Sequence, residues 1–136
     1  QRMPSRGAAT LGSDPVSAYS RALEALRRKA YPEAMAALRD FTKSWPRHDL
    51  ADNARYWLGE AYYDQQDYTK ALAEFRLVVQ EYPGANKAPD ALVKAGFCHV
   101  KLRDVKSARH VLGQVIELYP KTAAARLAAE LLKELR

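Results

Sequence analysis

Few residues of this chain are of types that carry out chemistry, and they lie far apart. Cys98 is the single cysteine, so no internal disulfide can form, and its apolar surroundings favour a small buried thiol over a reactive one. The histidines, His48, His99 and His110, lie in different segments. His99 and His110 could approach each other across a pair of helices, but two histidines without a third ligand make a weak zinc site. We therefore expect no bound metal.

The arrangements that usually mark an active site are missing from the sequence. It contains no glycine-rich phosphate loop, no nucleophile elbow and no Cys/His metal spacing. The acidic side chains are spread along the chain, so no pair of carboxylates is marked out for acid–base chemistry. The sequence predicts a protein that is not an enzyme and that needs no cofactor.

The charge of the chain alternates along its length. The net charge of +6 is made up of +1 over residues 1–14, +3 over 15–46, −3 over 47–83, +3 over 84–120 and +2 over 121–136. A nucleic-acid binder generally presents a continuous basic stripe to the phosphates, and this alternation interrupts one. We interpret the charge as solvated helix surface and expect no nucleic-acid partner. The alternative, an anionic-surface binder, predicts affinity that falls steeply with salt.

The apolar runs and the start of the chain set further limits. The longest apolar stretches are a few residues, far short of the roughly 20 that cross a bilayer, so we expect no membrane insertion. The sequence starts at Gln1 with no signal-peptide pattern, which favours a fragment of a longer precursor, or a mature or expressed piece. Residues 1–13 contain Gly, Ser and Pro with little apolar content, and we interpret them as a flexible linker or tail.

An internal repeat is the strongest signal in the sequence. Three prolines that follow an aromatic residue, Pro46, Pro83 and Pro120, are 37 residues apart at both steps. When several independent sets of residues recur at the same spacing, the chain is a repeat array. The same step of 37 relates Ala22, Gly59 and Gly96; Tyr31, Tyr68 and Val105; and Ala34, Ala71 and Ala108.

Each repeat has the pattern of two helices. In the second repeat, Leu58, Ala61 and Tyr62 recur at helical spacing, and a second apolar series follows the polar break at 64–67. Asp14 and Asp67 are placed to cap helices. The aromatic–proline pairs at 45–46, 82–83 and 119–120 should each end a second helix, because the residue before proline disfavours helical conformation. We expect helices near 15–29, 32–44, 50–65, 68–81, 88–102, 105–118 and 122–135.

Small residues at the repeat positions predict how the helices pack. Glycine inside a helix costs roughly 1 kcal/mol relative to alanine, so Gly59 and Gly96 need a compensating close approach of another helix. The matching small residues on the second helices are Ala34, Ala71 and Ala108. One turn later, the space beside them should be filled by Leu38, Phe75 and Leu112.

These units resemble the tetratricopeptide repeat, with its small residue midway along the first helix, its Tyr and Ala in the second helix and its closing Pro. The resemblance covers residues 15–120 and departs from the family pattern in the first turn, where Lys29-Ala30-Tyr31-Pro32 replaces the usual Gly-Asp-Tyr. It implies an all-α fold, a right-handed solenoid of three tetratricopeptide-type helix-turn-helix repeats plus a C-terminal capping helix. The domain would span 14–136, with repeats at about 15–46, 52–83 and 89–120 and the cap at 122–135.

A narrower resemblance comes from the run YWLGEAYY at 56–63 and the connection PGANKAPDAL at 83–92. Both are similar to the C-terminal domain of the YbgF/CpoB family, the Tol-Pal system protein that coordinates cell division in Gram-negative bacteria. This resemblance implies a periplasmic location and an upstream trimeric coiled coil. It also implies two partners, the inner-membrane protein TolA and a bifunctional peptidoglycan synthase.

The repeat also predicts a partner-binding groove. Stacked helix pairs curl, so the first helices line the concave side, and aromatic and apolar side chains there suit capture of a peptide or helix. Trp57, Tyr62 and Phe75 are assigned to the core instead. Alternatives are a generic scaffold or a self-assembly module whose repeat ends stack between chains. The expected groove residues are Tyr19, Leu23, Asn53, Tyr56, Glu60, Tyr63, Asp90, Val93, Phe97 and Val100.

Overall fold

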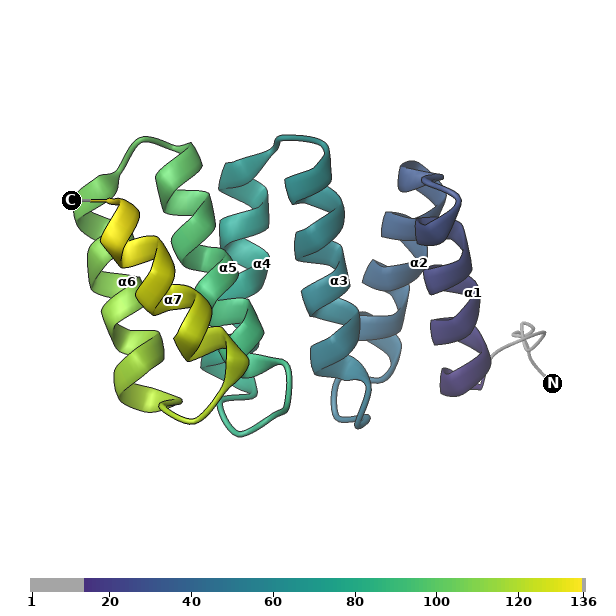
Figure 1. Cartoon of the computed structure of the whole chain (residues 1–136). Helices are drawn as coiled ribbons and strands as arrows, with labels where there is room; N and C mark the ends of the chain where they lie inside the picture. Colours follow the sequence, from purple (N-terminus) through teal and green to yellow (C-terminus); the bar gives the residue numbers. More distant parts are fainter. Residues whose placement is uncertain (1–13, 136) are drawn as a thin grey trace, which may run out of the picture. The chain divides into compact units, whose positions relative to one another are not determined.

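The computed structural model describes residues 14–135, which form seven α-helices and no strand (Figure 1). The observed bounds lie within about two residues of those expected from the sequence, so the all-helical prediction is confirmed. The interpretation of residues 1–13 as a linker lies outside the described residues. The helices are α1 (Pro15–Arg27), α2 (Tyr31–Ser44), α3 (Ala51–Asp64), α4 (Tyr68–Glu81), α5 (Ala88–Lys101), α6 (Val105–Leu118) and α7 (Ala123–Glu134).

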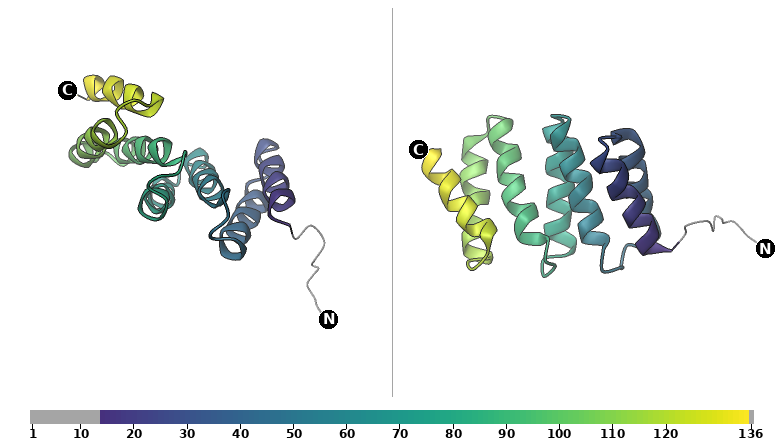
Figure 2. Two further views of the ribbon diagram at one scale, coloured as in Figure 1. Left: turned by 90° about the horizontal axis from the view of Figure 1, so that it is seen from below. Right: turned by 45° about the vertical axis from the view of Figure 1, so that its right-hand side comes forward.

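The helices belong to two compact units, and the division falls inside α3, between Leu58 and Gly59. In the first unit, α1 packs along α2. In the second unit, α5 packs against α4, α6 and α7, and α7 also packs against α6 (Figure 2). The second unit therefore has α5 at its centre, where side chains from several helices meet.

The starts of α1, α4, α6 and α7 are fixed by side-chain caps. The carboxylates of Asp14, Asp67 and Asp104 each accept a hydrogen bond from the backbone N–H three residues later, at 2.9, 3.3 and 3.1 Å. Such a cap satisfies one of the unpaired N–H groups of the first helical turn. The caps expected at Asp14 and Asp67 are confirmed. Asp104 repeats Asp67 after 37 residues, and Thr122 caps α7 in the same way.

The turns within the three repeats share one backbone geometry. Lys29, Gln66 and Arg103 have φ angles of 62°, 66° and 64°, in the left-handed region. Each residue lies 37 positions from the next. The first turn thus has the geometry of the others although its sequence departs from the family pattern. The conformation is set by the helix pair, because none of these residues is a glycine, the residue that prefers this region.

The packing predicted for the small residues is present. Ala34, Ala71 and Ala108 are fully buried. In the second unit, Gly59 lies against the ring of Phe75 and Gly96 against Leu112, with no room for a Cβ atom. The glycines thus allow the first and second helices of a repeat to cross closely, which offsets their cost in helix propensity.

The last helix, predicted as a cap, also continues the 37-residue repeat. Ala88 and Ala91 of α5 recur after 37 residues as Ala125 and Ala128 of α7, and all four are buried. Ala125 and Ala128 close an apolar cluster with Leu92, Val93, Leu112, Val115 and Ala124. Accordingly, α7 takes the place of a first helix in a further repeat and covers α5 and α6.

Candidate functional site

Side chains from α3 and α5 meet around Lys94 in the second unit. The Nζ atom of Lys94 lies 3.1 Å from Oε1 of Glu60, 4.2 Å from the ring centroid of Tyr63 and 5.3 Å from that of Phe97. The side chains of Lys94 and Glu60 are 18% and 23% exposed. We call Glu60, Tyr63, Lys94 and Phe97 the Lys94 cluster. It brings together three of the predicted groove residues from two consecutive repeats.

The Lys94 cluster is suited to recognition rather than to proton transfer. A half-buried ion pair attracts more strongly than one in open water, and an ammonium group over an aromatic face gains further energy. Burial raises the pKa of Tyr63, so its hydroxyl stays protonated at neutral pH and can donate a hydrogen bond. The exposed parts of the cluster thus offer aromatic surface, a cation and a carboxylate to an incoming peptide.

Cys98 lies one helical turn after Lys94 and is fully buried. Burial raises the pKa of its thiol to about 12, although the nearby Lys94 acts in the opposite direction. The thiolate is the reactive form, so this cysteine is chemically inert in the folded protein. The expectation of a small buried thiol is confirmed.

In the first unit, Tyr19 is held in the packing between α1 and α3. Its hydroxyl accepts a hydrogen bond of 3.0 Å from Nε1 of Trp57, and its ring meets Phe41 edge-on with centroids 5.9 Å apart. Burial raises the pKa of Tyr19 despite hydrogen bonds with Trp57 and Asn53. Tyr19 and Asn53, two predicted groove residues, are therefore brought together, and Trp57 is only half-buried.

The remaining predicted groove residues differ in the solvent exposure of their side chains. Tyr56 and Val93, the repeat equivalents of Tyr19, are 8% and 3% exposed and contribute mainly to packing. Asp90 is half-buried in the first turn of α5, where the helix dipole favours an acid. A binding role for these residues stays a prediction. Leu23 and Val100 are also half-buried.

Lys94, the residue that joins the cluster, is not among the residues predicted for the groove. Lys94 is 37 residues after Trp57, so the two occupy the same position in consecutive repeats. The aromatic ring of Trp57 favours a core position, so the sequence does not predict this repeat position on the groove face. Applying the 37-residue step to Trp57 would have placed Lys94 beside Phe97 on the first-helix face.

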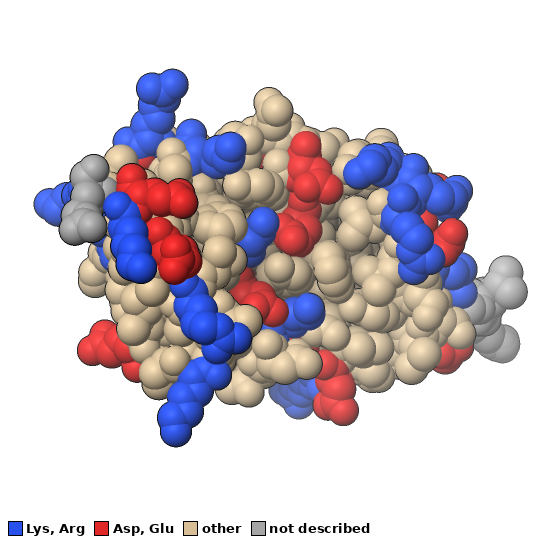
Figure 3. All heavy atoms as spheres, in the orientation of Figure 1, with Lys and Arg blue, Asp and Glu red and all other residues tan. Residues whose placement is uncertain are grey.

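On the face shown in Figure 3, basic and acidic side chains lie over different helices. Lys and Arg group over the turn between α1 and α2, and acidic side chains lie over α3. In the α1–α2 group, Arg27 pairs with Glu24 at 2.7 Å and Arg28 with Glu33 at 3.8 Å, and all four side chains are more than half exposed. Exposed pairs of this kind contribute little to stability and are typical of solvated surface.

Residues 14–135 show neither a metal-binding cluster nor a membrane-spanning helix. This part of the chain holds no group of three or more His, Cys, Asp or Glu side chains arranged to bind a metal ion. None of its helices has the length and apolar character needed to cross a membrane.

The fold is similar to solved tetratricopeptide-repeat structures. The first domain of Spaghetti (RPAP3) bound to the HSP90 peptide SRMEEVD has a TM-score of 0.71 with 15% identity, covering 91% of both chains. The first domain of human RPAP3 gives 0.70, with 15% identity and 91% of both chains covered. The second human RPAP3 domain, in complex with the HSP70 peptide SGPTIEEVD, gives 0.69 with 15% identity, covering 90% of this chain and 98% of that chain.

The sequence comparisons are in agreement with the fold. A comparison with curated proteins gives no match. Two family models described as tetratricopeptide repeat match residues 17–86 and 62–131, and the first alone spans half of the chain. Together with the seven helices and their 37-residue period, these matches show that the chain belongs to the tetratricopeptide repeat family.

Proposed function

We propose that this protein holds a peptide segment of a partner protein on the Lys94 cluster. The main support for this proposal is the position of Lys94. Its Nζ atom is half-buried and lies 3.1 Å from Oε1 of Glu60 and 4.2 Å from the ring centroid of Tyr63. A carboxylate of the partner would approach Lys94 in competition with Glu60. An apolar side chain of the partner would pack on the exposed ring surface of Tyr63 and Phe97, as in other helical-groove interactions.

The similar solved structures support a peptide as the bound species. The first Spaghetti domain and the second human RPAP3 domain hold the peptides SRMEEVD and SGPTIEEVD, and both peptides are short and acidic. Tetratricopeptide repeats as a family indicate a protein-interaction module. The ligand of this chain would likewise be a peptide. The Lys94 cluster would determine which peptide sequences bind.

A peptide selection tests this proposal. A phage-displayed peptide library is selected on the whole immobilised chain, and the enriched peptides are measured against Tyr63→Ser and Lys94→Gln. Each variant should lower affinity about tenfold, because central aromatic and charged contacts carry most of the energy of an interface. Lys70→Gln, on an exposed residue of α4, serves as the matched control and should bind normally.

The selection has a clear contrary outcome. If the enriched peptides bind both cluster variants as tightly as the native chain, while circular dichroism shows these variants folded, the Lys94 cluster is not the site. Measuring molar mass over a range of concentrations separates peptide binding from self-assembly. A mass that rises with concentration would favour the self-assembly module.

A more specific proposal places the protein in the bacterial cell envelope. It would act in the periplasm as a YbgF/CpoB-like protein that coordinates outer-membrane constriction with peptidoglycan synthesis, through TolA and a bifunctional synthase. The support is the PGANKAPDAL connection at 83–92 and the 37-residue repeat, which exceeds the 34 residues typical of the family. Residues of the Lys94 cluster would then contact one of these partners.

This envelope proposal is tested with purified proteins. The periplasmic parts of TolA and of the synthase from the same organism are mixed separately with the chain and analysed by size-exclusion chromatography. Co-elution with either one, weakened by Tyr63→Ser, supports the proposal. Separate elution at concentrations well above the micromolar range would exclude it while leaving the general peptide-binding proposal intact.

A further inference from the structure

A concave surface lies on the second unit, between α4, α5 and α6, and none of its lining residues belongs to the Lys94 cluster. This recess has a volume of about 790 Å³. Its floor is apolar and consists of Leu92 and Ala95 of α5, flanked by Val79 of α4 and Val111 of α6. Leu92 is 6% exposed and Ala95 1%, so the floor is firmly packed.

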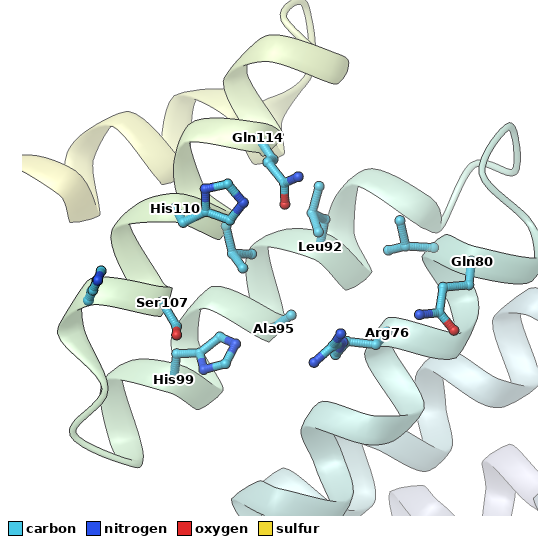
Figure 4. Close-up of a pocket in the computed structure, with 11 residues that line it drawn as sticks. Arg76, Gln80, Leu92, Ala95, His99, Ser107, His110 and Gln114 are labelled. Atoms are coloured by element: carbon cyan, nitrogen blue, oxygen red, sulfur yellow. The ribbon is translucent and has the colours of Figure 1, made fainter.

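Basic and amide side chains surround this floor. Figure 4 shows Arg76 and His99 directed toward the centre of the recess from α4 and α5, and His110 and Gln114 entering from α6. Lys106 also belongs to the lining. None of the lining residues carries a carboxylate. An opening with an apolar floor and an entirely cationic and neutral rim is complementary to a segment that is both apolar and acidic.

The cations of the rim are available to a ligand. Within residues 14–135, the side chains of Arg76 and Lys106 form no ion pair, and both residues are exposed. Asp104, in the α5–α6 turn, is an acid near the rim. Its Oδ2 lies 3.8 Å from Nδ1 of His99, and Lys106 is among the groups that lower its pKa. Its other oxygen accepts the backbone N–H of Ser107 as the cap of α6, so this carboxylate is engaged at the helix start.

We propose that this recess is a second docking site, which takes a short acidic peptide segment of a partner protein with a large apolar side chain at its centre. The apolar side chain lies on Leu92 and Ala95 between the two valines. Glutamate or aspartate side chains on either side of it pair with Arg76 from α4 and Lys106 from α6. His110, Gln80 and Gln114 donate further hydrogen bonds from the rim.

The chemistry of the recess favours a peptide over a free anion. A phosphate or a lone carboxylate would use the cations but would leave the half-buried side chains of Val79 and Val111 in contact with water. Burial lowers the pKa of His99, so at neutral pH its imidazole is uncharged and the positive charge comes from Arg76 and Lys106. These two residues lie on different helices and are suited to contact separate carboxylates along one segment.

A fluorescence-polarisation assay tests the proposal. The probe is a labelled decapeptide in which glutamates flank a central Leu-Phe pair, titrated with the whole chain at low and moderate salt. Arg76→Gln combined with Lys106→Gln should weaken binding by at least about tenfold, since charge-assisted hydrogen bonds are among the stronger polar contacts. The matched control is Lys70→Gln with Lys133→Gln, two cations of similar exposure outside the recess, which should leave the affinity unchanged.

Changes in the peptide and further protein variants identify the contacts that supply the binding energy. Replacing the Leu-Phe pair by Ser-Ser, or all glutamates by glutamine, should each reduce binding about tenfold or more. Gln114→Trp should reduce it as well, because an indole would fill the mouth of the recess. Tyr63→Ser, in the Lys94 cluster, should have no effect, so failure of this proposal and failure of the proposed function are distinguishable.

The contrary results are equally specific. Equal binding by the native chain and the Arg76/Lys106 variant, with both folded by circular dichroism, would exclude the recess. Loss of binding in Tyr63→Ser instead would move the acidic peptide to the Lys94 cluster. Full displacement of the probe by millimolar inorganic phosphate would show that the recess takes free anions rather than a peptide.

Discussion

Gly96 of α5 lies so close to Leu112 of α6 that a Cβ atom on the glycine would be 2.6 Å from Leu112 Cδ2. Gly59 stands in the same relation to Phe75, at 2.7 Å from its ring, whereas Gly113 of α6 has nothing within 4 Å of such an atom. Leu112 and Phe75 are fully buried, so neither can easily move aside. The three helical glycines therefore respond differently to the same substitution.

Gly96→Ala and Gly59→Ala should each lower the free energy of unfolding by about 1–2 kcal/mol, because overpacking outweighs the gain in helix propensity. Gly113→Ala should raise it by about 1 kcal/mol, since only the propensity changes. Urea unfolding followed by circular dichroism measures all three. A stabilising Gly96→Ala would show that the two helices can separate without cost.

The residues with positive φ predict a second set of stability changes. Gln66→Gly and Arg103→Gly should each stabilise the protein by about 0.5–1 kcal/mol, because glycine adopts the left-handed region without the strain of a side chain. Glycine also makes the unfolded chain more flexible, which limits the gain. Ala73→Gly, at an exposed position inside α4, is the matched control and should cost about 1 kcal/mol in the same urea titration.

The cap of α6 predicts a pH dependence of stability. Hydrogen bonds from Ser107 hold the pKa of Asp104 below its ordinary value of 3.8. The stabilisation is complete above that ordinary value and is lost as pH falls through the lower pKa of the folded state. Thermal unfolding between pH 2 and pH 7 should therefore show a smaller acid loss for Asp104→Asn, which keeps an oxygen acceptor but does not titrate. If Asp104→Asn has the same pH profile as the native chain, the charge of the Asp104 cap does not contribute to stability.

The ion pair in the Lys94 cluster predicts an asymmetry between its partners. Lys94→Met should cost about 1–2 kcal/mol, because it leaves the half-buried Glu60 carboxylate with one partner fewer and removes the contacts of the ammonium with two rings. Glu60→Gln should cost less, since the rings continue to shield Lys94. A double-mutant cycle in urea gives the coupling energy, and a value near zero would show that the pair is only a surface contact.

Cys98 predicts a chemical reactivity that depends on folding. With a thiol pKa of about 12 and no exposed surface, Cys98 should react with a disulfide reagent at pH 8 far more slowly than the same chain in concentrated urea. In the folded protein, the rate of thiol labelling should follow the rate at which the structure opens locally and exposes Cys98. Fast labelling of the native chain, without unfolding, would contradict this burial.

The sequence alone determined the order and the bounds of the helices. Hydrophobic period, the capping acids and the aromatic–proline pairs are local signals, and they predicted each helix within about two residues. The 37-residue step also relates the two packed pairs, because Gly59 and Phe75 are related within one repeat as Gly96 and Leu112 are in the next. Periodicity relates equivalent positions, and so it carries packing information along the chain.

The tertiary structure decided which side chains remain available. Helical phase placed Tyr56 and Val93 on the groove face, but neighbouring side chains bury both almost completely. Lys94 gains its importance from Glu60 and Tyr63, which lie on another helix and come close only after packing. The basic recess likewise combines residues from α4, α5 and α6. Exposure and charge pairing depend on contacts between separate helices, and no local pattern in the sequence encodes those distances.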